Sequence, residues 1–286
     1  MNTAIAQDLT ATIDESIKAL AAETDAARQN EAFRLWLTTM SLFYSYSFGN
    51  QMLIAFQCPT ATHVAGFRRW QSMNRFVRKG EKGIRILAPI IRRKEEETTK
   101  DGKTSRIAGF RVASVFDIAQ TDGEPLPEAP EHDATTGGED LLPKIEAAIR
   151  ACGIELIYKA IAGGAQGLSR GGTIEIEQEQ TISAKCGTAV HEWAHEQLHK
   201  NDRGQGKQQQ RELEAEAVAF AVLTHYGMQP GSQFYLASYG ITGEMLSATM
   251  QTISTTARQI IERIEGGAAK DEEEAGGAGL QADQAA

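Results

Sequence analysis

The chain has 286 residues, of which 41% are hydrophobic and 23% charged, so it is long enough for one large or two ordinary globular domains. It contains no run of 18 apolar residues and no basic-then-apolar leader, which excludes a transmembrane or secreted protein and predicts a cytoplasmic one. The net charge is −9, yet residues 61–111 contain 14 Lys and Arg against 5 Asp and Glu, which indicates a local polyanion-binding face.

The first 58 residues are predicted to be helical. Apolar residues recur at helical spacing in DESIKALAAE. A longer helical stretch begins with Asn30 as its N-cap and ends at Pro59, with a break at residues 48–50. We also expect a short helix at residues 66–72.

A β-rich segment follows these helices. The sequence RFVRKGEKGIRILAPIIRRK predicts a strand, a glycine-containing turn and a second strand, so that Arg78, Lys79 and Lys82 lie at the tip of a hairpin. The sequence SRIAGFRVASVFDIAQT is rich in Val, Ile and Phe and predicts a third strand. The polar residues KEEETTKDGKTS between them are expected to form the tip of a hairpin.

The second half of the chain is predicted to begin after a linker. Residues 122–140 are rich in Pro, Gly and acidic residues and contain few large apolar ones, which is the composition of a linker between domains. The sequence LLPKIEAAIRACG then predicts an amphipathic helix, and IELIYK and GGTIEIEQ predict strands. We expect helices at residues 181–200 and 207–227, and two further helical segments within 231–265.

These elements predict an α+β protein with two domains. The predicted parts are an N-terminal helical and β-hairpin domain at 1–122, a linker at 123–139, a second domain at 140–265, and a low-complexity, disordered tail at 266–286.

The stretch TAVHEWAHEQLHK, residues 188–200, contains a motif for metal binding. On a helix His191 and His195 lie one turn apart on the same face, so both imidazoles can reach one cation. Glu192 lies about 100° around the helix, where its carboxylate can take a proton from a water without binding the metal. Two nitrogens and one oxygen suit Zn²⁺ with an open fourth position, so we predict a zinc-dependent hydrolytic site with Glu192 as general base.

A third ligand is expected from the next helix, RELEAEAVAFAV. Glu216 is followed by small and apolar residues, so a carboxylate there is buried and costly unless it is paired or binds a metal; we predict that Glu216 is the ligand. Glu212 shares its face and could orient a ligating histidine, whereas Glu214 points elsewhere. His199 lies too far along the first helix to join the other two histidines.

Two features near this site remain open to more than one interpretation. His225 and Tyr226, at the end of the second helix, could stabilise an oxyanion or could simply end the helix. His199 could be a surface histidine or support a ligand from outside the site.

The same residues resemble a known family. TAVHEWAHEQLHK followed by ELEAEAVAFAV is similar to the IrrE/ImmA-type metallopeptidases over residues 140–265. The resemblance implies a zincin-like fold with zinc on His191, His195 and Glu216. Val218 departs from that family, which often has Asn at this position.

Cations and aromatic residues alternate in the basic segment HVAGFRRWQSMNRFVRKGEKGIRILAP. Cations neutralise phosphates and flat rings stack on unpaired bases, so this pattern favours binding of single-stranded nucleic acid. The alternative is a solvated basic hairpin that contacts an acidic protein surface. The candidate DNA-contact residues are Arg68, Arg69, Trp70, Arg75, Arg78, Lys79, Lys82 and Arg85.

The N-terminal part also resembles a known family. The run from Asn50 through QCPTAT to VRKGEKGI is similar to the N-terminal domain of ArdC-type antirestriction proteins, over residues 8–120. This resemblance implies a single-stranded-DNA-binding domain coupled to a metallopeptidase-like domain, in a mobile-element protein that protects incoming DNA from restriction.

Together these patterns predict an antirestriction-type protein that binds single-stranded DNA, carries a zinc metallopeptidase domain, and either cleaves or only binds a host protein. A first alternative is a regulatory peptidase that cleaves a repressor and uses the basic domain for targeting. A second is a non-catalytic DNA-binding protein with a structural zinc, for which His199 is the nearby candidate for a fourth ligand.

Overall fold

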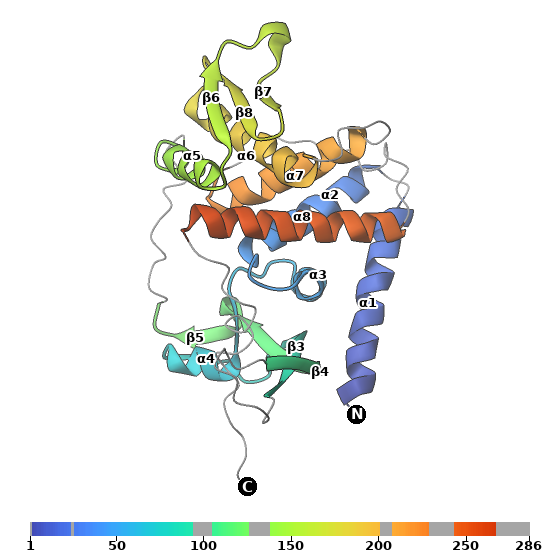
Figure 1. Ribbon diagram of the computed structural model, residues 1–286. Coiled ribbons are helices and arrows are strands. Elements are labelled where there is room, and N and C mark those ends of the chain that lie inside the picture. Colours follow the sequence, from blue (N-terminus) through green and yellow to red (C-terminus); the bar gives the residue numbers. More distant parts are fainter. Residues whose placement is uncertain are drawn as a thin grey trace. The chain divides into compact units, whose positions relative to one another are not determined.

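The computed structural model describes residues 2–23, 26–93, 105–125, 138–200, 208–228 and 243–266, and Figure 1 shows its helices and strands. It is a mixed α and β structure, as predicted. Its chain divides into two compact units. Unit 1 consists of Met1–Ser16, Ser45–Leu126 and Asp271–Ala286, and unit 2 consists of Ile17–Tyr44 and Pro127–Lys270. None of the described helices has the length and apolar character needed to cross a bilayer.

Unit 1 is built on a three-stranded antiparallel sheet with the order β1-β4-β3 and a separate pair, β2 with β5. Its elements are the first part of α1 (Asn2–Ala22), α3 (Phe48–Gln57), β1 (Val64–Gly66), α4 (Phe67–Ser72), β2 (Arg75–Val77), β3 (Ile84–Arg93), β4 (Ser105–Asp117), η1 (Ile118–Gln120) and β5 (Thr121–Gly123).

The pairing of these strands corrects one prediction. The glycine-containing turn at residues 78–83 joins β2 to β3, but the two strands do not form a hairpin with each other. β2 pairs with β5, which lies about 45 residues further along the chain, and β3 pairs with β4. The other predicted hairpin, with the polar residues KEEETTKDGKTS at its tip, is formed by β3 and β4. Its tip lies outside the described residues.

The free edge of β3 is covered by side chains of helix α3. Asn50 accepts a hydrogen bond from the backbone N–H of Leu87 and donates one to its carbonyl, at 2.8 and 2.9 Å. Gln57, two helical turns later, does the same for Arg85, at 2.9 and 2.8 Å. These four bonds satisfy backbone groups that an edge strand otherwise leaves open to another strand.

Unit 2 combines a small sheet, with the order β6-β8-β7, and a set of helices. Its elements are the last part of α1, α2 (Ala26–Leu42), α5 (Leu141–Ala151), β6 (Glu155–Lys159), η2 (Ala162–Gly164), β7 (Gly167–Ser169), β8 (Thr173–Glu177), α6 (Ile182–Leu198), α7 (Gln208–His225) and α8 (Gly243–Ile264). β8 runs parallel to β6 and antiparallel to β7, and its Ile174 and Ile176 are fully buried.

Helices α6 and α7 pack on each other at the centre of unit 2. Thr181 caps α6 by accepting a hydrogen bond from the backbone N–H of Ala184. Small residues fill the buried side of α7, which lets the two helices approach closely. The fully buried residues of these helices are Cys186, Ala189, Val190, Trp193, Ala194, Ala215, Ala217, Val218, Ala221 and Val222.

Helix α6, which carries His191 and His195, is also held against the sheet of unit 2. The buried Glu196 carboxylate accepts hydrogen bonds from the Ser169 hydroxyl at 2.7 Å and from the backbone N–H groups of Gly171 and Gly172 at 2.5 and 2.6 Å. Bonds of this kind to an ionised carboxylate are strong, so they hold the turn after β7 in place against α6.

Residues 17–44 group with unit 2. In α2 the side chains of Phe33, Trp36, Leu37 and Met40 are buried, and this helix packs on α7. Unit 2, which carries His191 and His195, therefore includes a helix from the N-terminal part of the chain. Most of the predicted linker, one of the two helical segments expected within 231–265, and the predicted tail lie outside the described residues, and the domain boundaries stay a prediction.

Candidate metal centre and nucleic-acid interface

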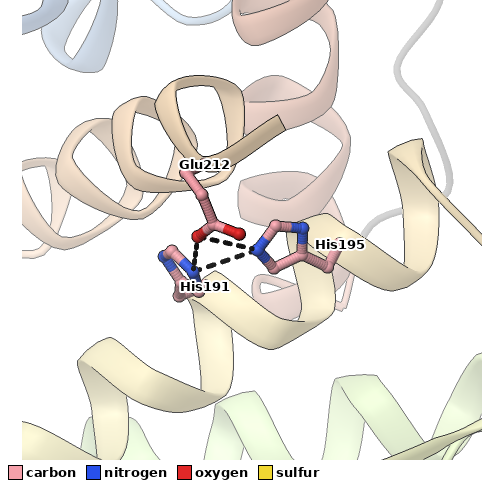
Figure 2. Close-up of side chains that lie close together, drawn as sticks. All are labelled: His191, His195 and Glu212. Carbon is pink, nitrogen blue, oxygen red and sulfur yellow. Dashed lines mark hydrogen bonds and ion pairs between the residues drawn. The ribbon is translucent and has the colours of Figure 1, made fainter. Parts of the chain in front are cut away.

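His191 and His195 occupy adjacent turns of α6, and their rings point toward Glu212 on α7 (Figure 2). The two Nε2 atoms are 3.1 Å apart. One carboxylate oxygen of Glu212 lies 3.5 Å from each of them. Helices α6 and α7 run in opposite directions here, because His191 lies against Glu216 and His195 against Glu212.

This group of three donor atoms fits a divalent metal ion. The atoms all lie within 4.8 Å of one another. Ligand atoms at 2.0–2.2 Å from a tetrahedral ion are about 3.4 Å apart, close to the separations found here. Two imidazole nitrogens and one carboxylate oxygen form a donor set that Zn²⁺ accepts readily.

Glu216 lies on the other side of the His191 ring. The Nδ1–H of His191 donates to the Glu216 carboxylate at 3.1 Å, while its Nε2 faces Glu212 and His195. A carboxylate that accepts from the remote nitrogen of a ligating histidine fixes the tautomer and orientation of its ring. The geometry therefore favours Glu212 as the third donor and Glu216 as the orienting group, the reverse of the roles predicted from sequence.

The carboxylates of Glu212 and Glu216 favour the protonated form of His191 when no metal is bound. Burial disfavours the charged ring of His191, but its hydrogen bonds to Glu212 and Glu216 outweigh burial and raise its pKa to about 9. The same bonds to His191 and His195 hold the pKa of Glu212 far below its usual value. A metal ion must therefore displace a proton from His191 at neutral pH.

This proton gives a testable pH dependence. The apparent affinity for chelator-buffered Zn²⁺ is expected to rise at least about tenfold per pH unit between pH 6.5 and 8.5 and to level off near pH 9, because the proton leaves above that pKa. Glu216→Gln removes one of the bonds that raise the pKa of His191, so levelling should begin at a lower pH. An affinity that does not change over this range would contradict the assignment.

Glu192 lies beside the donor group on the same helix. Its side chain is 8% exposed and faces β7, where Ser169 N–H donates to its carboxylate and its Oε1 lies close to the Cα of Gly167. Burial raises the pKa of Glu192, opposed by the positive charges of His191 and His195. His191 and Glu192 line one cavity of about 320 Å³, so a molecule in that cavity can meet both.

The other histidines lie outside this group. His199 Nε2 is 3.6 Å from the buried carboxylate of Glu214, which points away from the donor group. At the end of α7, His225 donates from Nδ1 to the Ser41 carbonyl at 2.9 Å, and its Nε2 lies 3.3 Å from Glu265. These contacts favour the interpretation of His225 as part of a helix end.

Two of the eight predicted DNA-contact residues are buried in unit 1. Trp70 is 1% exposed, and its indole N–H donates to the carbonyl of Phe116 at 2.8 Å. Arg75 is 8% exposed, and its guanidinium donates to backbone carbonyls of the β5 region and to the Thr121 hydroxyl. Neither side chain is placed to meet a nucleic acid, because both are satisfied inside the unit.

The remaining six predicted residues are exposed, and Arg78 among them forms ion pairs. Arg78 lies 2.9 Å from Glu81 and 3.5 Å from Asp122, so part of its charge is neutralised locally. The other exposed residues of the predicted set are Arg68, Arg69, Lys79, Lys82 and Arg85.

Several of these residues gather at one face of the β1-β4-β3 sheet. Arg85 lies opposite Ser114, and residues opposite each other share a face. On that face the Phe116 ring contacts the Phe67 ring, with centroids 6.5 Å apart. Gly83, in the turn at residues 78–83 (the basic turn), packs close to Ser114 and Phe116. The first turn of α4 and the turn 78–83 are therefore brought to the same face as Arg85.

Exposed aromatic side chains accompany these charges. Phe67 is 48% exposed and Phe110, which shares the face of Phe116, is 54% exposed. Phe76 on β2 is 57% exposed. The pattern of cations and aromatic residues in the basic segment did not single out Phe110, which lies outside that segment. Alternation along β4 could have identified Phe110, because it lies six residues before Phe116 and in phase with it.

Comparison with known proteins places the N-terminal part of the chain. Residues 3–116 match the N-terminal domain of anti-restriction factor ArdC. This match runs from α1 to β4 and includes the turn at residues 78–83 and the exposed aromatic residues.

Similar proteins are found along more of the chain. The uncharacterized protein pXO2-81 of Bacillus anthracis is 25% identical over 278 residues, covering 79% of this chain and 46% of the relative; the chain thus spans about half the length of that relative. The crystal structure of metal-free antirestriction ArdC from R388 plasmid is 18% identical, covers 78% of this chain and 86% of its own, and gives a TM-score of 0.45. The Mn(II)-bound structure of the same protein is 17% identical and gives a TM-score of 0.42. The match covers 85% of this chain and 98% of that one.

Proposed function

We propose that this protein is an antirestriction-type factor that binds single-stranded DNA through its ArdC-type domain and hydrolyses peptide bonds at a metal site in unit 2. The observation that carries the hydrolytic part is the meeting of His191, His195 and Glu212 beside the buried Glu192. The match of residues 3–116 to ArdC supports the antirestriction part.

The metal would be held by His191, His195 and Glu212, with Glu216 fixing the ring of His191. When bound, Zn²⁺ supplies Lewis acidity that polarises a peptide carbonyl and lowers the pKa of water. Mn²⁺ also accepts imidazole and carboxylate ligands and is tested beside Zn²⁺. His199 lies against Glu214, outside the donor group, which favours an open position over a closed structural site.

Glu192 acts as the general base in this proposal. Burial keeps the pKa of the Glu192 carboxyl above its usual value. This brings the pKa nearer to the pH at which a general base must accept and release a proton. It takes a proton from the attacking water and returns it to the departing amine. The Ser169 N–H fixes one side of the carboxylate, so its orientation is set before substrate arrives.

The hydrolytic proposal is tested by Glu192→Gln in the full chain. The variant should bind one equivalent of Zn²⁺ or Mn²⁺ like the wild type and should lose at least about a hundredfold in cleavage of a mixed peptide pool, because general-base catalysis contributes about 10²–10⁴ in rate. Equal cleavage by both proteins would sink the assignment of Glu192.

The same variant separates antirestriction from proteolysis. If transferred DNA loses its protection in cells that carry Glu192→Gln, peptide hydrolysis is part of the antirestriction mechanism. If protection survives while the metal stays bound, peptide hydrolysis is not part of the antirestriction mechanism and serves another purpose, such as cleavage of a repressor.

The DNA-binding proposal is tested at Lys79 and Lys82, the exposed lysines of the turn at residues 78–83. The double variant Lys79→Glu, Lys82→Glu is expected to weaken binding of a single-stranded oligonucleotide by tenfold or more at low salt and to reduce the salt slope by about 2, because each lysine neutralises about one phosphate. The control Lys18→Glu, Lys144→Glu has the same net charge and places both changes outside unit 1. If both double variants lost the same affinity for the oligonucleotide, the effect would come from net charge alone and the basic turn would not be a DNA contact.

A further inference from the structure

Strand β7 turns part of its backbone toward helix α6. Among the strands that the structure describes, β7 lies at the edge of its sheet and pairs only with β8. The Gln166 carbonyl and the Arg170 N–H, on either side of β7, bond to β8 at 2.9 Å. Bonding groups alternate along an antiparallel strand, so those of Gly167 and Ser169 face away from β8. β7 contacts α6, and the Ser169 N–H donates to the Glu192 carboxylate.

The contact between β7 and Glu192 is close. A Cβ atom built on Gly167 would lie 2.8 Å from the Cγ and 2.9 Å from the Oε1 of Glu192, and 2.5 Å from the Cγ2 of Thr188. Heavy atoms that are not bonded to each other do not approach this closely, so only glycine lets the strand backbone lie against the Glu192 side chain. The position of β7 therefore limits where the Glu192 carboxylate can lie.

Glu196 holds the other end of β7. Its side chain is 4% exposed and accepts a hydrogen bond from the Ser169 hydroxyl at 2.7 Å. The backbone N–H groups of Gly171 and Gly172 donate to it at 2.5 and 2.6 Å. Both glycines have positive φ, at 78° and 112°, which lets their N–H groups face one carboxylate. Ser169 thus gives its hydroxyl to Glu196 and its N–H to Glu192, so one residue joins the two carboxylates.

We propose that Glu196 is a positioning residue for the general base: it holds Ser169 in the place from which the Ser169 N–H orients the Glu192 carboxylate. The inference rests on the peptidase function proposed above and adds to it a residue outside the metal donor group. Glu192 and Glu196 lie one turn apart on the side of α6 that faces β7. The two histidines face α7 instead. Loss of the Glu196 bonds should therefore release β7 and Glu192 without removing a donor to the metal.

The positioning can be measured without catalysis, in the metal-free full chain. Glu196→Gln keeps the shape of the side chain but replaces one acceptor oxygen by an NH2 group, so it cannot accept from all three donors. Amide hydrogen exchange of Ser169 is expected to become about tenfold faster or more. The NMR signal of the Glu192 carboxyl carbon, identified by its loss in Glu192→Gln, should move.

Glu146→Gln is the matched control. Glu146 lies on α5 of the same unit, accepts a hydrogen bond from the Tyr158 hydroxyl at 2.6 Å, and its replacement makes the same change in net charge. Ser169 exchange and the Glu192 signal should stay as in the wild type in this variant. A Glu192 signal that does not move in folded Glu196→Gln, or that moves equally in Glu146→Gln, would overturn the proposal.

Ser169→Ala gives a milder test, should Glu196→Gln fail to fold. It removes the hydroxyl that donates to Glu196 and keeps the backbone N–H that donates to Glu192. The Glu192 carbon signal should move in the same direction as in Glu196→Gln and by a smaller amount. An unmoved signal in this variant would show that Glu196 does not act through Ser169 and would overturn the proposal.

Cleavage of a peptide pool by the zinc-loaded protein gives the second measurement. Glu196→Gln should lower kcat by about ten- to a hundredfold, because a misplacement of about 1 Å can cost a hundredfold in rate, and should leave the affinity for Zn²⁺ unchanged. In the Glu192→Gln background the same change should cost less than about twofold, because Glu196 acts through Glu192. Losses that multiply in the double variant would overturn the inference alone. A wild type that cleaves no peptide would overturn the peptidase function instead, and the Glu192 carbon signal would then decide the positioning.

Discussion

Replacing Glu212 by alanine is expected to lower the affinity for Zn²⁺ by more than about a hundredfold, because its carboxylate oxygen is the donor that faces both Nε2 atoms. Glu216→Ala should cost less, about ten- to a hundredfold, because Glu216 holds the remote nitrogen of His191. Competition with a chromophoric chelator at pH 7.5 measures both affinities on the same scale.

The two variants form a matched pair on one face of α7. Glu212 and Glu216 are one turn apart and comparably exposed, with 52% and 40% of their side chains accessible. A general loss of negative charge near the histidines would therefore weaken both variants equally. A larger loss in Glu216→Ala than in Glu212→Ala would restore the ligand set predicted from the sequence and refute the one favoured by geometry.

Truncation of Trp70 is expected to destabilise unit 1 by about 3–5 kcal/mol. Its ring is almost fully buried, so Trp70→Ala leaves a large cavity, and the Phe116 carbonyl loses the hydrogen bond from the indole. Urea unfolding monitored by amide exchange in the β1-β4-β3 sheet measures the loss. Unchanged exchange in this variant would show that the indole is not part of the core.

Phe67 provides the contrasting variant on the same short helix. Because Phe67 is 48% exposed, Phe67→Ala should change the free energy of unfolding by about 0.5 kcal/mol or less. If its ring stacks on a base, the variant should weaken single-strand binding by about 1–3 kcal/mol. An inverted pattern, with Phe67 needed for stability and Trp70 for DNA, would reverse the roles that burial assigns to them.

The metal motif was the most predictable part of the molecule. Helical spacing alone places His191 and His195 on one face, and the structure keeps them there. The third donor was harder to predict, because its identity depends on how α7 lies across α6. Burial was the sequence criterion for Glu216, but Glu212 and Glu216 are both half-exposed, so burial does not distinguish them.

The basic segment shows a second limit of sequence reasoning. Composition identifies a stretch where cations and aromatic residues alternate, but it does not show which side chains face inward. Trp70 faces the core because α4 is a single short helix against β4, which a pattern of six residues cannot reveal. Strand pairing between β2 and β5 is also non-local, and it is this pairing that buries Arg75.

The account depends most on a divalent cation held between α6 and α7. Crystals of the full chain soaked in Zn²⁺ and measured at the zinc absorption edge test this most directly. The account predicts one anomalous peak about 2.0–2.2 Å from the Nε2 atoms of His191 and His195 and from a carboxylate oxygen of Glu212. A peak bound through Glu216 with Glu212 turned away, or a fully zinc-loaded protein with no peak at these histidines, would contradict it.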